Sequence, residues 1–436
     1  MTGGGPAHRL PRLIEDFESA GDGGTKAVLL AVQLPEVADP DFEDTLGELG
    51  RLARTLGMAV VASVSQRRLS FHSATYVGAG KLEELKAAIA ESGADVVLTD
   101  HEISPSQARN LEKATELPVM DRTGVILEIF HRHARSRAAR AQVEIVRLQY
   151  MAPRMRVLGA GRDRQRGGIG GKGAGESSME LDRRKIRDRV AELTAELAHL
   201  ETEARTQRAR RRDLNRVALV GYTNAGKSTL MRALTGSDVY VADKLFATLD
   251  TTVRTMTPPT FPPVLISDTV GFIDNLPHDL VASFKSTLDE ALEASLLVHV
   301  VDASDRGWRR QLAVTREVLA EIGAGALPHL LVFNKMDRVG DAVAQAALAQ
   351  LVLSQWPDAV MMSARSPDDV AFLHDHLAAS FRGVLIEEEV LIPYDRQQLR
   401  AVVFEECEVL GERYVDNGVI FRVRATAAAL EKLRPA

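Results

Sequence analysis

Residues 216–229 read Arg216-Val217-Ala218-Leu219-Val220-Gly221-Tyr222-Thr223-Asn224-Ala225-Gly226-Lys227-Ser228-Thr229, and this stretch decides the fold. Its apolar start predicts a buried strand, and the residues after it predict a helix. The spacing G-x-x-x-x-G-K-S between them is that of a phosphate-binding loop, in which the glycines let backbone N–H groups and the helix N-terminus point at a phosphate. Lys227 can reach the β- and γ-phosphates, and the Ser228 hydroxyl can bind Mg²⁺.

A glycine-rich turn of this pattern can also arise by chance. Three further motifs distinguish a nucleotide-binding loop from such a turn. Each follows an apolar run: Asp268-Thr269-Val270-Gly271, then Asn334-Lys335-Met336-Asp337, then Ser363-Ala364-Arg365. Asp268 can hold Mg²⁺ through water, and the N–H of Gly271 can sense a γ-phosphate. The Asp337 carboxylate can accept two N–H bonds that guanine offers and adenine does not. Residues 363–365 can close over the base. The order of motifs predicts a domain that binds GTP.

Composition is that of a soluble globular protein with several domains. The 436 residues are 45% hydrophobic and 26% charged, with a single cysteine, which excludes an internal disulfide and a multi-cysteine metal site. No apolar run is long enough to span a bilayer, and the N-terminal residues lack the apolar segment of a signal peptide. We expect a cytoplasmic monomer.

Alternating strands and helices organise the first part of the chain. We predict a flexible tail over residues 1–25 and a small parallel α/β domain over 26–122. Within it, Gly78-Ala79-Gly80-Lys81 resembles the end of a phosphate loop, but Thr75 and Leu82 depart from the pattern. We interpret it as a turn before a helix, and a second nucleotide site remains the alternative.

A helical hairpin is predicted over residues 123–214. Apolar residues recur at spacings of three and four in two sets, one from Ala134 to Ala152 and one from Ile186 to Leu200. Between them lies a glycine- and arginine-rich loop. From His131 to Val190 there are sixteen Lys and Arg against six Asp and Glu, although the net charge of the chain is −6. We predict an RNA-facing tip, with a disordered linker as the alternative. Its candidate RNA contacts are Arg162, Arg164, Arg166 and Lys172.

The GTPase domain is predicted over residues 215–382, as a doubly wound sheet with its site at the carboxyl ends of the strands. A threonine between the phosphate loop and Asp268 would complete the Mg²⁺ shell and form the first switch. Residues 383–436 predict a small α+β domain, with a strand over 384–392, a helix over 396–407 and a hairpin turning at Asn417-Gly418.

With these parts in this order, the chain resembles the HflX family of ribosome-associated GTPases from about Ala27 to Ala425. The resemblance implies a factor that binds the large ribosomal subunit and its RNA through the N-terminal and helical domains. It also implies separation of stalled or idle ribosomes into subunits, with GTP hydrolysis allowing release. By that pattern Thr248, rather than Thr251 or Thr252, binds Mg²⁺. The motifs that carry the resemblance are the phosphate loop, Leu245-Phe246-Ala247-Thr248-Leu249-Asp250, Asp268-Thr269-Val270-Gly271-Phe272, Arg166-Gly167-Gly168-Ile169-Gly170 and Leu181-Asp182-Arg183-Arg184.

The tip loop and Phe272 bear on the expected splitting and GTPase activities. The tip loop reads Gly173-Ala174-Gly175-Glu176-Ser177-Ser178 where the family pattern is Gly-Pro-Gly-Glu-Thr-Gln, which affects the strength of splitting and not the fold. Phe272, shared with the family, stands where many GTPases place a glutamine that orients water, so hydrolysis is expected to be slow until the ribosome assists. No catalytic side chain is assigned from the sequence.

Two other functions fit the same domains. One is a GTPase for ribosome assembly or tRNA modification, and the other is a GTP-dependent protein that holds ribosomes inactive. The expected cofactor is Mg²⁺. Asn224 also resembles GTPases that use K⁺ beside the phosphates, and that alternative stays open.

Overall fold

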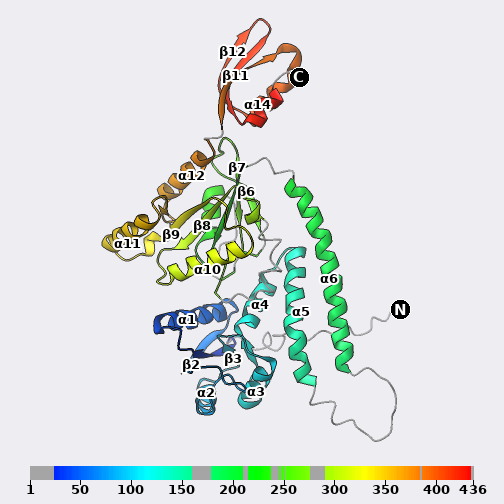
Figure 1. Cartoon of the computed structure of the whole chain (residues 1–436), viewed down its shortest axis with the longest axis vertical. Coiled ribbons are helices and arrows are strands. Elements are labelled where there is room, and N and C mark those ends of the chain that lie inside the picture. The colour runs from blue at the N-terminus through cyan, green and yellow to red at the C-terminus, as the bar shows by residue number, and fades with distance from the viewer. Residues whose placement is uncertain are drawn as a thin grey trace. The chain divides into compact units, whose positions relative to one another are not determined.

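The computed structural model of the chain describes residues 24–159, 178–209, 215–236, 245–246, 248–249, 251–274, 290–382 and 385–433. Contacts divide the chain into two compact units (Figure 1). The first comprises Met1–Glu201, Lys244–Phe246 and Asn275–Phe284, and the second comprises Thr202–Asp243, Ala247–Asp274 and Lys285–Ala436. The chain therefore returns to the first unit at residues 244–246, inside the predicted first switch.

Four parallel strands form the N-terminal sheet, in the order β2-β1-β3-β4. After Lys26 every residue of β1 is buried, as expected for a strand with helices on both faces. Helix α3 begins at a capping box in which Ser104 and Gln107 bond each other's backbone N–H. The predicted small parallel α/β domain is confirmed. Its elements are β1 Lys26–Gln33, α1 Asp39–Thr55, β2 Ala59–Arg67, α2 Ala79–Ser92, β3 Val96–Thr99, α3 Pro105–Thr115 and β4 Val119–Asp121.

A further helix, α4 Arg122–His133, follows β4 directly and was not expected as a separate element. Its start is fixed by Asp121, whose Oδ1 accepts the N–H of Gly124 at 2.9 Å. The guanidinium of Arg122 is 2% exposed and pairs with the carboxylates of Asp100 and Glu48. Because an unpaired buried charge is costly, this network fixes α4 against the N-terminal sheet.

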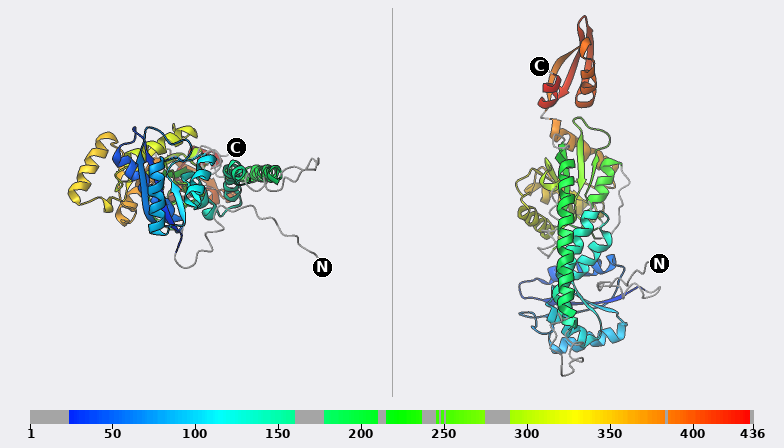
Figure 2. Two further views of the ribbon diagram at one scale, coloured as in Figure 1. Left: turned by 90° about the horizontal axis from the view of Figure 1, so that it is seen from below. Right: turned by 90° about the vertical axis from the view of Figure 1, so that its right-hand side faces the viewer.

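Two long helices, α5 Arg137–Gly159 and α6 Ser178–Ala209, form the predicted hairpin. Figures 1 and 2 both show them side by side. The apolar residues predicted to face each other do form a common core, with Ala141, Ile145, Leu148, Ile186 and Leu193 buried and Ala152, Val190 and Leu197 packed against them. The period of the sequence pattern therefore identified the seam correctly.

The sheet of the second unit has the strand order β10-β9-β8-β5-β7-β6. Its strands are parallel except β6, which runs antiparallel to β7. This is the predicted doubly wound α/β domain with an antiparallel edge. The elements are β5 Asn215–Gly221, α7 Lys227–Thr235, β6 Thr252–Thr255, β7 Val264–Asp268, β8 Leu296–Asp302, α10 Trp308–Glu321, β9 His329–Asn334, η2 Met336–Arg338, α11 Ala342–Gln355, β10 Val360–Met361 and α12 Pro367–Arg382.

The C-terminal residues form a three-stranded antiparallel sheet in the order β11-β13-β12 with helices on one face. The turn prediction was off by one residue, because Val415 pairs with Gly418 and the turn is Asp416-Asn417. Glycine is needed at 418 for another reason: a Cβ there would lie 2.4 Å from the carbonyl oxygen of Ile392. The elements are β11 Ile386–Pro393, η3 Tyr394–Arg396, α13 Gln398–Glu406, β12 Glu408–Val415, β13 Gly418–Ala425 and α14 Ala427–Leu433.

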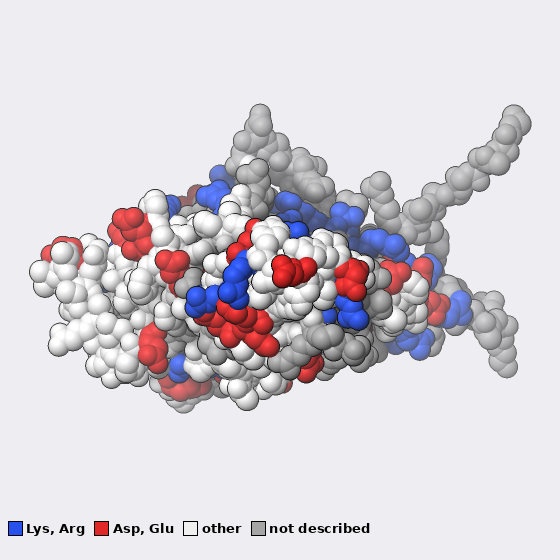
Figure 3. Space-filling view, turned by 90° about the horizontal axis from the view of Figure 1, so that it is seen from above, with Lys and Arg blue, Asp and Glu red and all other residues white. Residues whose placement is uncertain are grey.

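Ion pairs tie the strands of this C-terminal sheet together. Arg422 pairs with Glu387 on the neighbouring strand, and Arg424 pairs with Glu408 at 3.3 Å. The face of the molecule in Figure 3 shows both signs of charge next to one another near its middle.

Candidate functional site

The phosphate loop connects β5 to α7 in the conformation that the glycines predicted. Gly221 and Gly226 have φ values of +146° and +99°, which other residues rarely adopt. A Cβ at Gly226 would also lie 2.3 Å from the amide nitrogen of Asn334. The two glycines therefore allow both the turn of the loop and its close approach to the N-K-x-D segment. Of the other loop residues, Tyr222, Thr223 and Ala225 are buried, Ser228 and Thr229 are half-buried and Asn224 is exposed.

Lys227 is buried at the start of α7, and no carboxylate of the described residues forms an ion pair with it. Its Nζ donates to the carbonyl oxygens of Gly221 and Tyr222, each at 3.0 Å. Burial lowers the pKa of Lys227 to about 8, and the positive charge of Lys335 acts in the same direction, against the opposing effect of Asp268. An anion placed beside Nζ would restore the charged form, which is what a phosphate group supplies.

Three oxygen-bearing side chains converge at the end of β7. The Ser228 Oγ and the Thr248 Oγ1 donate to Asp268 Oδ2 at 2.6 and 3.0 Å and lie 2.8 Å from each other. Burial raises the pKa of Asp268, and its other oxygen, Oδ1, is buried with no hydrogen-bond partner in the described part of the chain. Hydroxyl and carboxylate oxygens are the ligands that Mg²⁺ prefers, and a cation would satisfy the unpaired Oδ1 directly or through water. The donor set therefore fits Mg²⁺.

The predicted first switch is divided between the two units. Leu245 and Phe246 belong to the first unit, where the Phe246 ring meets Phe130 edge-on at 4.6 Å and its carbonyl accepts the Nδ1–H of His133 at 2.8 Å. The Phe246 side chain therefore packs within the first unit, and it is not among the residues that line the pocket described next. Leu249 is buried as well, whereas Ala247 and Asp250 lie outside the described residues.

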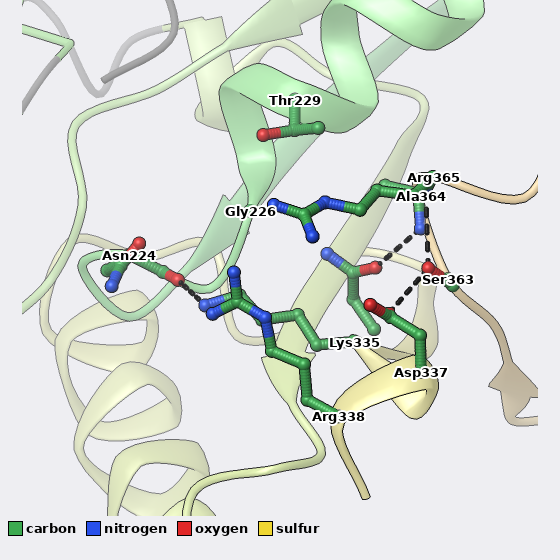
Figure 4. A pocket seen from close by; sticks show the side chains of 10 residues that line it. Asn224, Gly226, Thr229, Lys335, Asp337, Arg338, Ser363, Ala364 and Arg365 are labelled. Carbon is green, nitrogen blue, oxygen red and sulfur yellow. Dashed lines mark hydrogen bonds between the residues drawn. The ribbon is translucent and has the colours of Figure 1, made fainter. Parts of the chain in front are cut away.

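A pocket lies between the phosphate loop and the two last motifs, where the sequence predicts the base (Figure 4). Asn334 joins them, because its Nδ2 donates to Ala225 O and its Oδ1 accepts Ala364 N, both at 2.9 Å. Lys335 Nζ donates to Asn224 O at 2.6 Å and pairs with Asp302 at 2.7 Å. The pocket is lined by Asn224, Gly226, Thr229, Asn334, Lys335, Asp337, Arg338, Ser363, Ala364 and Arg365.

Asp337 is held at the wall of this pocket with one oxygen available. Its Oδ1 accepts the Ser363 hydroxyl at 2.6 Å, and the same hydroxyl oxygen accepts Arg365 N at 3.2 Å. No hydrogen bond to Oδ2 is seen among the described residues. Two residues of the site were not expected from the sequence: Arg338 lines the pocket, and Asp302, at the end of β8, fixes Lys335.

The remaining candidate residues lie apart from the pocket. Thr269 is buried and its hydroxyl donates to Leu219 O at 2.7 Å, Val270 is buried, and Met336 is half-buried in η2. The candidate RNA contacts Arg162, Arg164, Arg166 and Lys172 lie outside the described residues. Gly78 precedes α2 and donates its N–H to Gln66 Oε1 at 2.9 Å, as a turn before a helix does.

Neither a bilayer-spanning helix nor a further metal cluster is present within the described part of the chain. None of the described helices has both the length and the apolar character that crossing a membrane requires. The described residues also contain no group of three or more His, Cys, Asp or Glu side chains that could hold a metal ion.

Three family profiles match consecutive parts of the chain. "GTP-binding GTPase N-terminal" matches residues 43–131, "GTP-binding GTPase Middle Region" matches 133–211 and "50S ribosome-binding GTPase" matches 216–335.

Two relatives that match this chain over nearly their full length are both named GTPase HflX. A protein of Gluconacetobacter diazotrophicus called GTPase HflX is 51% identical, over 94% of this chain and 97% of its own. The GTPase HflX of Escherichia coli is 38% identical, over 92% and 93%. A solved GTP-binding protein of Sulfolobus solfataricus in complex with GDP is 23% identical with a TM-score of 0.45, over 82% of this chain and 99% of its own.

Proposed function

Because the chain belongs to the HflX family of GTPases, we propose that it binds the large ribosomal subunit and separates stalled or idle ribosomes into subunits. In this proposal GTP binding favours the ribosome-bound state, and hydrolysis to GDP allows release. The observation that carries it is an exposed basic segment on the helical hairpin of a chain that holds a GTP site. We also expect the protein to act in the cytoplasm as a monomer.

The basic segment lies at the start of α6. Arg184, Lys185, Arg187 and Arg189 are exposed there, and Asp188 is the one acidic residue among 183–190. Arg189 pairs with Glu192, where the acidic residues that balance the rest of the helix begin. Arginine and lysine side chains on one helix end contact phosphates of RNA without reading its sequence. Ile186 within this segment is buried in the apolar seam, whereas the basic side chains around it are exposed, so docking on them leaves the hairpin core intact.

In the GTPase domain each motif residue has a task that follows from its position. Lys227 reaches the phosphates, the N–H of Gly271 senses the γ-phosphate, and Asp337 accepts the guanine N–H groups. Ser228 and Thr248 would hold Mg²⁺, which when bound neutralises charge on the phosphates. Thr248 reaches both Ser228 and Asp268, which favours it over Thr251 and Thr252 as the switch threonine.

The test is light scattering of intact 70S ribosomes mixed with the protein and a non-hydrolysable GTP analogue. A fall in scattering would show that binding alone separates the subunits. Unchanged scattering, with binding confirmed by co-sedimentation, would contradict splitting. Association with immature particles or tRNA instead of ribosomes would favour assembly or modification.

A variant pair tests the basic segment. Replacing Arg184, Lys185 and Arg187 by alanine should weaken ribosome binding and lower the slope of log affinity against log salt by about two to three, since each side chain removed leaves one phosphate unneutralised. The matched control replaces three exposed arginines of the second unit, Arg306, Arg396 and Arg413. An equal effect in both variants would show that net charge, and not the start of α6, determines binding.

A further inference from the structure

The segment after β7 is joined to the phosphate loop by backbone hydrogen bonds. Thr223 N donates to Phe272 O at 2.7 Å, and Phe272 N donates to Gly221 O at 3.1 Å. Tyr222 and Phe272 form a parallel β-bridge, and the Tyr222 hydroxyl accepts Asp274 N at 2.8 Å. Residues 271–274 therefore lie directly along residues 221–223, on the side where a γ-phosphate would meet Gly271.

The two side chains that directly follow Gly271 supply no polar group that could orient water, and the Asp274 carboxylate after them pairs with Arg310. Phe272 is 2% exposed and Ile273 is 1% exposed, so both are committed to the core. In GTPases with a glutamine after the glycine, the side-chain amide positions the attacking water. Here another group must position the attacking water if a side chain does so.

Thr223 has the properties that such a group needs. Its side chain is 6% exposed, and its Oγ1 is buried with no hydrogen-bond partner among the described residues. A buried polar atom left unpaired is costly and rare, so it points to a partner that binds later. The neighbouring hydroxyls are already engaged: Thr269 donates to Leu219 O, and Ser228 donates to Asp268.

The position of Thr223 matches the γ-phosphate end of the site. A Cβ built on Gly271 would lie 2.9 Å from both Cα and Cγ2 of Thr223 and 3.1 Å from Lys227 Nζ. Thr223, Gly271 and Lys227 are thus immediate neighbours. Rotation of χ1 to a neighbouring staggered rotamer places Oγ1 where Cγ2 now lies, so Oγ1 can reach the place beside Gly271 without backbone movement.

We propose that the Thr223 hydroxyl positions the water that attacks GTP, in place of the missing glutamine. A hydroxyl has one donor and two acceptor sites, so it can accept a hydrogen bond from the water and donate one to a γ-phosphate oxygen. The water oxygen forms a bond to the γ-phosphorus, the bond to the bridging β–γ oxygen breaks, and the water proton passes to the phosphate product. The products are GDP and inorganic phosphate. This role needs the GTPase activity alone and does not depend on ribosome splitting.

Three variants test the proposal: Thr223→Val, which keeps the shape and removes the hydroxyl, Thr223→Ser, which keeps the hydroxyl, and Thr223→Ala. The single-turnover rate of GTP hydrolysis should fall about tenfold or more in the valine and alanine variants, because they lose a hydrogen bond to the water and one to a charged phosphate oxygen, and remain near wild type with serine. Affinity for GDP should stay within about twofold in all three. Affinity for GDP with aluminium fluoride, which mimics the transferring phosphoryl group, should fall about tenfold with valine.

Two results would overturn it. One is a valine variant that hydrolyses GTP and binds the aluminium fluoride complex as wild type does. The other is a serine variant as slow as the valine variant, which would assign the effect to the methyl group. Should the valine variant fail to bind GDP, the alanine and serine pair decides by the same criteria.

Discussion

Lys227 makes nucleotide binding depend on pH in a range where an ordinary lysine would not. Burial lowers the pKa of its ammonium group to about 8 in the nucleotide-free chain, and a bound triphosphate restores the charged form. Binding must therefore be accompanied by proton uptake. With a free pKa near 8 and a bound pKa at the ordinary lysine value, uptake is about 0.1 proton at pH 7, about 0.5 at pH 8 and about 0.9 at pH 9. Affinity falls about tenfold from pH 7 to pH 9.

The assay is isothermal titration calorimetry of Mg²⁺–GTP in pairs of buffers that differ in ionisation enthalpy, because the difference in heat gives the protons taken up. The control is Lys227→Arg, whose guanidinium stays charged over the whole range. Any proton taken up by that variant belongs to the base or the phosphates and is subtracted. Uptake below about 0.1 proton at pH 8 after this correction would show that Lys227 keeps an ordinary pKa and would refute the reasoning from burial.

Four further predictions concern separate parts of the chain. Asp337→Asn should lower affinity for GDP about a hundredfold or more and favour xanthine nucleotides, and equal affinity for GDP would remove Asp337 from base recognition. Gly271→Ala should slow hydrolysis about tenfold or more with GDP affinity kept, because its Cβ meets the Thr223 backbone at 2.9 Å. Leu193→Ala should destabilise the hairpin by about 2–5 kcal/mol, against almost nothing for Leu69→Ala, which is 90% exposed. Burial raises the pKa of Cys407 to about 11, so folded protein should react slowly with maleimide at pH 8, and fast labelling would contradict its burial.

Local rules made much of the fold predictable. Each GTP motif comes directly after an apolar run, and in a parallel sheet the carboxyl ends of neighbouring strands share one edge. That is why Gly221, Asp268 and Asn334 were expected together, and β5, β7 and β9 do end at these residues. The seam of α5 and α6 was equally predictable, because its period is a property of consecutive residues.

Contacts between residues distant in the sequence could not be predicted from it. The aromatic contact of Phe246 with Phe130 joins residues more than a hundred positions apart, and no local pattern marks either partner. Helix α4 was missed although Asp121 marks its start locally; what the sequence does not mark is that its first residue, Arg122, is held by Glu48 and Asp100 from other elements. The ion pair of Asp302 with Lys335 was predictable in principle, because Asp302 is an acidic residue at the end of β8, the strand next to β9.

The described site shows where a difference between GTP and GDP can be read. Burial without a phosphate or a cation lowers the pKa of Lys227 and raises that of Asp268, and both shifts would be reversed by a nucleotide with Mg²⁺. Lys227 also serves the β-phosphate, so GDP can satisfy it in part. Gly271 and the unpaired hydroxyl of Thr223 have no such second partner in the proposed complex and gain a bond only when a γ-phosphate is present. Because a ligand shifts a conformational equilibrium only by its differential affinity for the two states, the switch must depend on these γ-phosphate contacts and on Thr248.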